Sequence, residues 1–566
     1  MVSDKPGVQR LVQICKAKGI TDVVFSPGSR NSPLVITFAD DPHFNCITIP
    51  DERVAGFFAM GMALQLRRPV IICCTSGSAA LNYAPAIVEA YYQNIPLLVI
   101  TADRPVEKID QGAGQTMRQK NVYANYIKVS YELTQEAESE QDLHANDRLI
   151  SEAIDNCTSE TDGPVHINFP LKEPLYDQVA YYDIEDLDMT RSINNELAIT
   201  AEVSLKMKEE WMSYPKKLII FGQSMPSEAI QLAVEAVADR SDIAIISETT
   251  SNINGSDVNP CIDRMITTFS EEEATACIPD LIISLGGAIV SKKIKSLFIK
   301  LKPKAHWYVS EQEQPQDTYE SLTMHVQTSA LQFLRMIKKF PEHGAANYQR
   351  LWTNHHEKTS QSHDKFLDDC PWSDMLSFHH ILQRIPSRSD LHLSNSSPIR
   401  YTQLFNQRDD IQYYCNRGVS GIDGCTSTAA GAGHASQNLT TIVTGDLAFM
   451  YDSNALWNQY LGGQLRIIII NNGGGGIFKI IPGPASTDQY KEFFATEQSY
   501  TAEHIAKTFY CSYQQAKDET ELLKGLDWLY STSFDKPAIL EVMTMKVDNE
   551  VILGNYFEFM KADKSG

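Results

Sequence analysis

The sequence lacks long apolar runs and has no cysteines at the spacing of a metal site. No stretch approaches the ~18 consecutive apolar residues of a membrane-spanning helix, and the first twenty residues lack the apolar core of a signal peptide. The 11 cysteines are scattered, odd in number and without a C-x-x-C pair. This usage indicates free thiols in a reducing compartment rather than disulfides or a zinc site. We therefore expect a cytoplasmic protein with no membrane insertion.

Positive charge is also scarce. The chain has 49 Lys and Arg against 71 Asp and Glu, for a formal net charge of −22. Such a surface disfavours nucleic acid or an anionic membrane as the main partner, although solubility alone is the plainer reason for it. Any anionic substrate would need a local group of Arg and Lys side chains.

The chain is too long for one hydrophobic core: 566 residues indicate three or four domains. Short apolar runs such as DVVF, VIICC and PLLVITA alternate with helical patterns, which is typical of a parallel sheet covered by helices on both faces. We predict an α/β protein of three consecutive doubly wound, mainly parallel-sheet domains, at residues 1–180, 181–360 and 361–566. The polar stretches 180–210 and 342–372 are candidate linkers.

Two strands of the last domain end in polar residues. TTIVTGD and LRIIIINN read as neighbouring parallel strands joined by the helix DSNALWNQYL. Their carboxyl ends would then face one crevice, where ligands bind in folds of this kind. Asp446 offers a carboxylate there, Asn472 an amide oxygen, and the four glycines that follow a backbone carbonyl. Three oxygen ligands suit Mg²⁺, and glycines allow a diphosphate to come close to the backbone.

Each part of this pattern can also be ordinary. An Asp after a strand is usually a turn residue, and NNGGGG by itself could be a loop. A dinucleotide-binding fingerprint fits poorly, because its glycines should open the first helix of a βαβ unit with an acid about 20 residues later. Here the acid precedes the glycines.

The pairing of Gly-Asp with Asn-Asn resembles the diphosphate–magnesium motif of thiamine-diphosphate enzymes. That motif usually reads G-D-G, whereas Leu447 stands third here. The resemblance implies that Asp446, the Asn472 side chain and the Gly474 carbonyl hold Mg²⁺ (or Mn²⁺). It also implies that Glu52, in IPDERVAGFFAMG, hydrogen-bonds the aminopyrimidine ring as the catalytic glutamate. The alternative for Glu52 is a first-turn residue favoured by the helix dipole.

Six motifs in order narrow the resemblance to one family. The chain is similar to the MenD family, the 2-succinyl-5-enolpyruvyl-6-hydroxy-3-cyclohexene-1-carboxylate synthases of menaquinone biosynthesis. The motifs are SPGSRNSPL, DERVAGFFAMGMA, TSGSAALN, TADRPVEKIDQGAGQTMRQ, NRGVSGIDGCTSTAAG and GDLAFMYDSNAL. The middle domain matches more weakly, chiefly at GGAIVSKK.

The resemblance implies a transferase that condenses 2-oxoglutarate with isochorismate by decarboxylation and 1,4-addition. Residues 1–180 would bind the pyrimidine and residues 361–566 the diphosphate and Mg²⁺, with active sites shared between copies in a homodimer or homotetramer. The cofactor-binding positions implied are Glu52, Thr75, Ser76, Gly77, Ile422, Gly445, Asp446, Leu447, Asn472, Gly474, Ile477 and Phe478.

Both substrates are dianions, and the family's matching positions carry the cations they need. Arg400 and Arg417 would face 2-oxoglutarate, since arginine suits bidentate capture of carboxylates. The remaining implied substrate-binding positions, chiefly for isochorismate, are Ser29, Arg30, Arg104, Gln115, Lys292, Ser396, Ile477, Phe478 and Ile481. For each Arg the alternative is a solvated surface charge, and for each apolar position it is core packing. Some relatives have Lys-Arg where this chain has Lys292-Lys293, which leaves the role of Lys293 open.

Three rival functions fit parts of the sequence. An acetolactate-synthase-like enzyme would act on pyruvate and would not need the arginines. A non-catalytic nucleotide-binding protein that kept the fold would be expected to have lost Glu52 or Asp446. A nicotinamide-dependent dehydrogenase is opposed by the position of the glycines.

Overall fold

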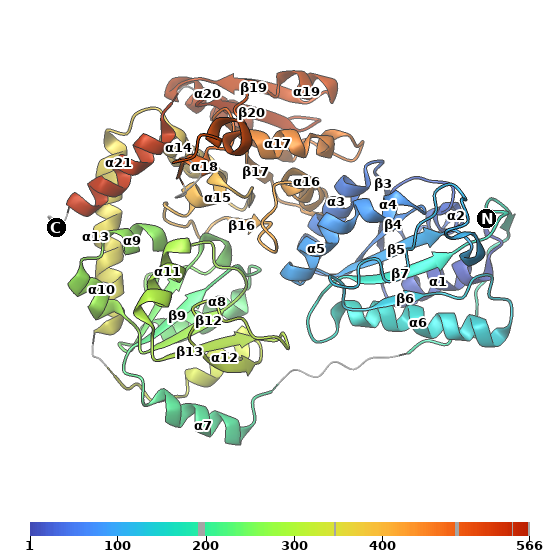
Figure 1. The fold of residues 1–566 in the computed structure, drawn as a ribbon, viewed down its shortest axis with the longest axis horizontal. Coiled ribbons are helices and arrows are strands. Elements are labelled where there is room, and N and C mark those ends of the chain that lie inside the picture. The colour runs from blue at the N-terminus through green and yellow to red at the C-terminus, as the bar shows by residue number, and fades with distance from the viewer. Residues whose placement is uncertain (191–197, 345–346, 481–485, 546, 564–566) are drawn as a thin grey trace.

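Three parallel β-sheets follow one another along the chain in the computed structural model (Figure 1), which describes residues 1–190, 198–344, 347–480, 486–545 and 547–563. Each sheet has six strands, and every strand pair within them is parallel. The predicted α/β class with three doubly wound domains is confirmed. Strands such as Val70–Cys74 are buried at every position, as expected where helices cover both faces.

The first domain contains the catalytic candidate of the sequence. Its sheet has the order β3 (Asn45–Thr48), β2 (Asp22–Phe25), β4 (Val70–Cys74), β5 (Leu97–Asp103), β7 (Val165–Pro170), β6 (Ser130–Glu132). Its helices are α1 (Pro6–Ala17), α2 (Ser32–Asp40), α3 (Glu52–Leu66), α4 (Ser78–Asn82), α5 (Ala84–Gln93) and α6 (Glu140–Thr158). A short antiparallel pair, β1 (Val2–Ser3) and β8 (Gln178–Val179), joins the start of the chain to the end of this domain.

The middle domain has a different strand order. Its sheet runs β11 (Val258–Asn259), β10 (Ile243–Ser247), β9 (Lys217–Phe221), β12 (Leu281–Leu285), β13 (Ala305–Ser310), β14 (Leu322–Gln327). Its helices are α7 (Ala201–Trp211), α8 (Glu228–Ala238), α9 (Ile262–Thr268), α10 (Glu271–Cys277), α11 (Lys292–Leu301) and α12 (Ala330–Ile337), and α13 (Tyr348–Asp368) leads to the third domain.

The third domain repeats the strand order of the first. Its sheet runs β16 (Gln412–Cys415), β15 (Asp390–Leu393), β17 (Thr440–Gly445), β18 (Leu465–Asn471), β20 (Ala538–Met543), β19 (Ser512–Ala516). Its helices are α14 (Asp374–Arg384), α15 (Ser397–Thr402), α16 (Cys425–Ala435), α17 (Asp446–Tyr451), α18 (Ile477–Ile480), α19 (Glu503–Thr508), α20 (Glu519–Ser531) and α21 (Asn549–Ala562). No helix in the described ranges is long and apolar enough to span a membrane.

Helices α3 and α16 join the first domain to the third (Figure 1). They pack so closely that a Cβ at Gly61 would lie 2.0 Å from the Thr428 carbonyl oxygen, and one at Gly431 would lie 1.9 Å from the Phe58 carbonyl oxygen. Only glycine fits at either position. One hydrophobic core includes buried side chains from both domains, among them Phe58 and Ala429. This contact fixes how the two domains sit in one chain.

Both candidate linkers contain helix. Residues 201–211 form α7, and residues 348–368 form α13, which packs against β10 on one side and α21 on the other. Most of the candidate linker over 342–372 is therefore helix. The buried face of α13 includes His355 and His363, so its composition looks polar although one side is covered. The predicted boundary at 360/361 falls within α13, and we propose this helix as the shared connection between the two domains.

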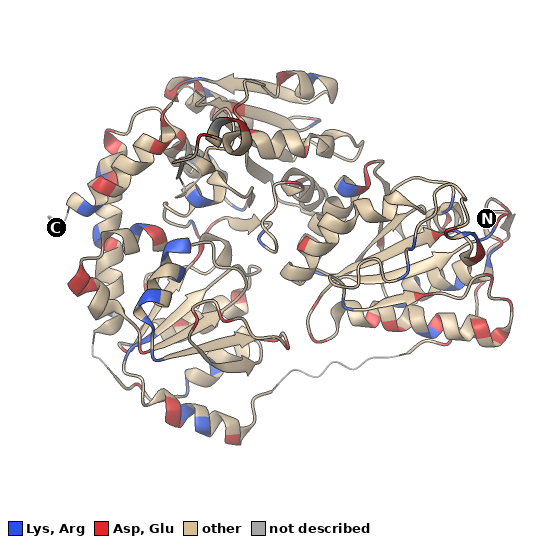
Figure 2. Cartoon of the chain, in the orientation of Figure 1, with Lys and Arg blue, Asp and Glu red and all other residues tan. Residues whose placement is uncertain are grey.

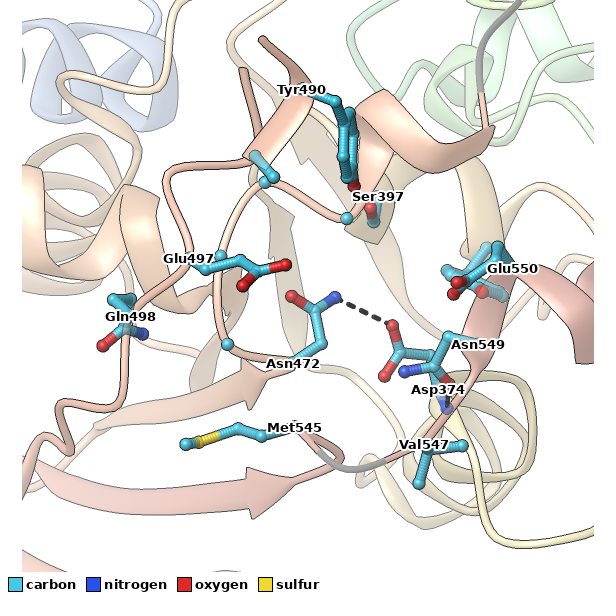
Figure 3. A pocket seen from close by; sticks show the side chains of 16 residues that line it. Asp374, Ser397, Asn472, Tyr490, Glu497, Gln498, Met545, Val547, Asn549 and Glu550 are labelled. Atoms are coloured by element: carbon cyan, nitrogen blue, oxygen red, sulfur yellow. Dashed lines mark hydrogen bonds between the residues drawn. The ribbon is translucent and has the colours of Figure 1, made fainter. Parts of the chain in front are cut away.

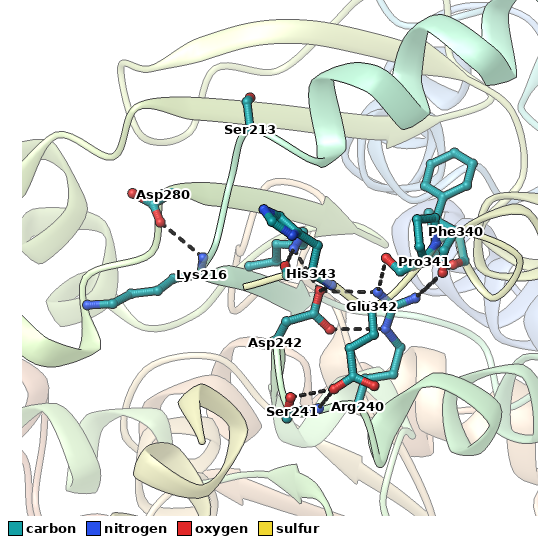
Figure 4. A network of polar contacts seen from close by, with 12 residues as sticks. Ser213, Lys216, Arg240, Ser241, Asp242, Asp280, Phe340, Pro341, Glu342 and His343 are labelled. Carbon is teal, nitrogen blue, oxygen red and sulfur yellow. Dashed lines mark hydrogen bonds and ion pairs between the residues drawn. The ribbon is translucent and has the colours of Figure 1, made fainter. Parts of the chain in front are cut away.

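A buried ion network ties the chain after α12 to the middle sheet (Figure 4). The Asp242 carboxylate accepts from Lys217 Nζ at 2.7 Å and from Arg240 Nε at 3.1 Å. Arg240 also donates to the carbonyl oxygens of Ile337 and Phe340, and Lys217 to that of His343. Since every charge here has several partners, the network anchors this segment without leaving a buried ion unpaired.

Candidate active site

The ends of β17 and β18 bring Asp446 close to the glycine loop, as the sequence predicted. Asp446 is 2% exposed. Its Oδ2 accepts from the Gly474 N–H at 2.8 Å and from Gln498 Nε2 at 2.6 Å, and its Oδ1 accepts from the Leu447 N–H at 2.9 Å. Burial raises the pKa of this carboxyl to about 6. A buried carboxylate at this edge would gain from a cation beside it.

A cavity of about 250 Å³ lies beside these residues (Figure 3). Asn472 and the glycines 473–476 line it, together with Asp374, Tyr401 and Gln498. Asn472 Nδ2 donates to Asp374 Oδ2 at 3.0 Å, and Asp374 Oδ1 accepts from Thr544 Oγ1 at 2.6 Å. Because the amide nitrogen of Asn472 donates to Asp374, the orientation of the amide group is fixed and its oxygen, Oδ1, remains available as an acceptor. That oxygen points to the same side of the cavity as the Glu497 carboxylate (Figure 3).

The residues at this edge fit a divalent cation bound to a diphosphate. Gly474 has φ +139°, and a Cβ there would lie 2.7 Å from the Ala495 carbonyl oxygen, so only glycine is accommodated. A carboxylate, an amide oxygen and backbone carbonyls are the ligands that Mg²⁺ prefers. Throughout the described part of the chain no three His, Cys, Asp or Glu side chains form a metal site, so a metal here would depend on this mixed set.

Glu52 begins α3 in the first domain, beside the loop that follows β4. Its Oε2 accepts from Asn82 Nδ2 at 3.3 Å. The helix is capped by the neighbouring Asp51, whose Oδ1 accepts the N–H groups of Arg53 and Val54. Since Asp51 already caps this helix, the cap does not require a carboxylate at Glu52.

The loop after β4 holds three of the predicted cofactor positions, Thr75, Ser76 and Gly77. The Gly77 N–H donates to Gln119 Oε1 at 2.8 Å, and a Cβ at Gly77 would lie 3.3 Å from the Gln115 Cα. Ser76 Oγ is buried and has no hydrogen-bond partner within the described residues. Gln115 therefore lies against this loop, as expected for one pocket wall.

Arg30 and Arg104 lie together at the same edge of the first domain. Arg30 is 4% exposed, and its guanidinium donates to the Leu171 carbonyl oxygen at 2.9 Å and to Glu173 Oε1 at 3.0 Å. Arg104 lies 3.7 Å from the same carboxylate oxygen. Burial and the nearby Arg104 charge lower the pKa of Arg30. The exposed Ser29 precedes Arg30, so three predicted substrate positions share this edge.

Four cations from two domains form a second group, which we call the cation cluster: Lys292, Lys295, Arg400 and Arg417. Arg400 lies on α15 and has no hydrogen-bond or ion-pair partner among the described residues, and its Nε is buried. Burial and the Arg417 charge lower the pKa of Arg400. Arg417 donates to Asn395 Oδ1 at 3.0 Å. Lysines gather on α11 (Figure 2), while acidic residues are spread over all three domains.

Lys295 and Glu248 were not identified from the sequence. Lys295 follows Lys292 by one helical turn. Burial lowers the pKa of Lys295, and the charges of Glu248, Arg417 and Lys292 also act on it. Glu248 is 1% exposed, directly after β10. Burial raises its pKa to about 7. An acid directly after a buried parallel strand was a usable signal, since SETTS follows DIAII as GDLAF follows TTIVT. The site residues Asp374 and Gln498 had no such signal.

The other predicted positions are less informative. Ile422 is half-buried in the loop between β16 and α16, and Ile477 and Phe478 are half-buried in α18. The Phe478 ring centroid lies 6.0 Å from that of Phe494. Ser396 immediately precedes α15 with φ +74°. Gly445 ends β17, and Ile481 lies outside the described residues.

Lys293 does not extend the cation cluster. Its Nζ donates to Thr267 Oγ1 on α9 and lies 3.5 Å from the Phe557 ring centroid on α21. The side chain therefore packs between these helices.

Among the described residues, neither Glu52 nor Thr75, Ser76 or Gly77 lines the cavity beside the glycine loop. Every residue that lines the cavity beside Asn472 comes from residues 374–550, and none from the first domain.

Comparison with known proteins bears on these observations. Residues 6–122 match the family model described as the thiamine pyrophosphate enzyme N-terminal TPP binding domain. The chain is 41% identical to 2-succinyl-5-enolpyruvyl-6-hydroxy-3-cyclohexene-1-carboxylate synthase of Flavobacterium psychrophilum over 553 residues, which is 98% of each chain. It is also 41% identical to the enzyme of the same name in Flavobacterium johnsoniae, over 97% of this chain and 98% of that one.

A solved structure supports the fold. The crystal structure of benzoylformate decarboxylase from Polynucleobacter necessarius matches with a TM-score of 0.71 at 16% identity, over 96% of this chain and 99% of that one. At this identity the likeness concerns architecture alone.

Proposed function

The chain belongs to the family of 2-succinyl-5-enolpyruvyl-6-hydroxy-3-cyclohexene-1-carboxylate synthases, thiamine-dependent transferases (EC 2.2.1.9) of menaquinone biosynthesis, and from this we propose its substrates and the roles of its residues. It condenses 2-oxoglutarate with isochorismate by decarboxylation and 1,4-addition, with release of CO₂. Thiamine diphosphate, when bound, supplies the carbon nucleophile and accepts the electrons left by decarboxylation.

The observation that carries the substrate assignment is the Arg400 guanidinium. Among the described residues it has no hydrogen-bond or ion-pair partner, and it lies close enough to Arg417, Asp263 and Glu248 to feel their charges. Keeping like charges together at a half-buried site costs free energy, which a bound dianion would recover. Arg400 and Arg417 therefore hold the carboxylates of 2-oxoglutarate.

Isochorismate is assigned to the first-domain edge and to the exposed end of α11. Arg30 and Arg104 hold its carboxylates, with Ser29 and Gln115 as polar contacts and Lys292 and Ser396 approaching from the other domains. Supporting this, the Nε atoms of Arg30 and Arg104 are both buried and lack partners in the described part of the chain. The arginines hold two anions together against their mutual repulsion, which is a positioning role.

The cofactor is assigned to two walls. Asp446, the Asn472 amide oxygen and the Gly474 carbonyl hold Mg²⁺ or Mn²⁺ on the diphosphate, with Gly445, Leu447, Ile422, Ile477 and Phe478 around it. Glu52 accepts a hydrogen bond from the aminopyrimidine ring and so stabilises the protonation state of the ring that activates the cofactor. Thr75, Ser76 and Gly77 belong to the same wall. Asn82 orients the Glu52 carboxylate in the free chain.

These two walls imply a homodimer at least, and a homotetramer is compatible with the same pairing. The separation of Glu52 from the third-domain cavity in one chain supports a site shared between copies. We place the enzyme in the cytoplasm, which the eleven free cysteines support. No nucleic acid is needed.

One assay tests the proposal. The purified protein is incubated with thiamine diphosphate, Mg²⁺ and 2-oxoglutarate, with and without isochorismate, and loss of the ultraviolet absorbance of isochorismate is followed. We expect isochorismate to be consumed only when thiamine diphosphate, Mg²⁺ and 2-oxoglutarate are all present with it. A parallel arm with pyruvate in place of 2-oxoglutarate distinguishes an acetolactate-synthase-like activity, and turnover of pyruvate alone would refute the assignment.

A further inference from the structure

Glu248 connects the two domains that carry the cation cluster. Its Oε1 accepts from the Ser291 N–H at 3.0 Å, and its Oε2 accepts from Gln403 Nε2. Ser291 is the N-cap of α11, the helix that carries Lys292 and Lys295. Gln403 is the C-cap of α15, the helix that carries Arg400. One carboxylate thus bonds the end of each cation-bearing helix.

The local bonds make this connection rigid. The Ser291 Oγ accepts from the Ile294 N–H at 3.1 Å and donates to the Asp263 carboxylate. The Gln403 N–H donates to the Ile399 carbonyl oxygen at 3.2 Å. The backbone of each partner is therefore held at the end of its own helix, and Glu248 links the two helix ends.

Electrostatic attraction for substrate does not explain a carboxylate at this position. Lys295, Arg400 and Asp263 all act on Glu248 or feel its charge, and with Glu248 buried the effect is poorly screened. A negative charge beside cations that hold a dianion weakens the attraction for that dianion. Burying a carboxylate also costs free energy. What the carboxylate supplies is geometry.

We propose that Glu248 is a positioning residue: by joining α11 of the middle domain to α15 of the third, it fixes the position of Arg400, which binds a 2-oxoglutarate carboxylate, relative to the lysines of α11. This rests on the proposed function, and it gives the middle domain a part in 2-oxoglutarate binding in addition to the proposed contact of Lys292 with isochorismate. Glu248 acts through Arg400 and does not touch the substrate.

The test compares two substitutions at this position by the KM for 2-oxoglutarate, kcat and the midpoint of thermal unfolding. Glu248→Ala removes both hydrogen bonds, and the KM should rise about tenfold or more while kcat changes far less. Glu248→Gln removes the charge but keeps both bonds, since its oxygen accepts from Ser291 and its amide donates to a reversed Gln403 amide. Its KM should stay within about threefold of wild type.

The matched control is Gln407→Ala. Gln407 Nε2 donates to the Thr249 carbonyl oxygen at 3.2 Å, so this variant removes another hydrogen bond between the same two domains without touching a cation. Its KM should match wild type. If Glu248→Ala does not fold, Gln403→Ala removes the same connection from the other side and should raise the KM in the same way.

The outcomes separate cleanly. An unchanged KM in Glu248→Ala, in an active wild-type background, overturns this inference alone. A Glu248→Gln variant as impaired as Glu248→Ala also overturns it, because charge rather than connection would then be at work. A wild-type protein without turnover of 2-oxoglutarate overturns the proposed function and this inference together.

Discussion

The Asp446 carboxylate accepts the Gly474 N–H at 2.8 Å, a hydrogen bond between residues 28 positions apart. It joins the first residue of α17 to the loop after β18, and the adjacent strands β17 and β18 pair as far as Gly445 and Ile470. The carboxylate is thereby aimed at the loop that lines the cavity, where we propose that the cation binds.

Asp446→Ala should raise the Mg²⁺ and thiamine diphosphate concentrations that give half activity by at least about tenfold, because it removes the only anionic member of the proposed ligand set. Titration of activity with each component measures this. Asp410→Ala, which removes an ion pair with Arg408 elsewhere in the same domain, is the control and should leave both values unchanged. Equal Mg²⁺ requirements in Asp446→Ala and wild type would contradict the metal assignment.

Glu52→Gln should lower turnover by roughly several powers of ten while the thermal midpoint stays at the wild-type value, because Asp51 caps α3 without it. The matched control is Glu503→Gln, which changes the first-turn glutamate of α19, a residue paired with Lys507. A helix-dipole role would make the two variants behave alike. Near-normal activity in Glu52→Gln would contradict the assignment of Glu52 as the catalytic residue.

Arg400→Ala should raise the KM for 2-oxoglutarate by about ten- to a hundredfold, as expected for loss of a charge-assisted carboxylate contact. The KM of Arg400→Lys should lie between those of wild type and Arg400→Ala, since an ammonium keeps the charge but lacks the planar guanidinium geometry. Half-saturation by thiamine diphosphate should not move in either. Arg384→Ala, which breaks a surface pair with Asp527, controls for general loss of charge.

Mixing the Glu52→Gln and Asp446→Ala variants should restore activity at Mg²⁺ and thiamine diphosphate concentrations at which neither variant is active alone. In a hybrid of a Glu52→Gln chain with an Asp446→Ala chain, one shared site has both changes and the other has neither, so about half of the sites per hybrid dimer should work. The hybrids can be isolated with two different affinity tags. Hybrids no more active than either parent would mean that each chain builds its site alone, as would a monomer by light scattering.

The buried Asp452 should make stability depend on pH. Its carboxylate accepts from Ser427 N–H and Oγ at 2.7 Å each, and burial raises its pKa to about 7. The folded state therefore holds this proton more tightly than the unfolded state, and the stability it gives at low pH is lost as pH rises from about 4 to 7.

Asp452→Asn removes that titration but can keep both bonds to Ser427. The free energy of unfolding of the variant should rise relative to that of wild type by about 1 kcal/mol per pH unit between pH 4 and 7. Above pH 7 the difference should stay constant. Thermal midpoints of both proteins across this range measure the difference. Buried histidines titrate alike in the two proteins and cancel, so a difference that does not vary with pH would contradict the raised pKa.

How much of the structure could be predicted from the sequence depended on the kind of sequence pattern. Buried strands such as Val70–Cys74 and Leu465–Asn471 were predicted because a short, unbroken, β-branched apolar run between turn residues is typical of a strand covered on both faces. The meeting of Asp446 with the glycine loop followed from the geometry of neighbouring parallel strands. Helix α13 was missed because its buried side is partly histidine, which composition reads as polar.

The remaining parts of the site depend on contacts between residues far apart in the chain. Asp374 orients Asn472 across 98 positions, and Gln403 reaches Glu248 across 155. No local pattern encodes such pairs. The sequence left the role of Lys293 open. Successive residues on a helix point in different directions, and the Lys293 side chain faces α9 and α21.

The contact of Gly61 with Thr428 and of Gly431 with Phe58 has a mechanical consequence. Backbone lies directly on backbone there, with no side chain in between to change rotamer as the helices slide. The first and third domains must then travel as one block. The middle domain is attached to this block by packing of α9 and α13 against α21 and by the hydrogen bonds of Glu248.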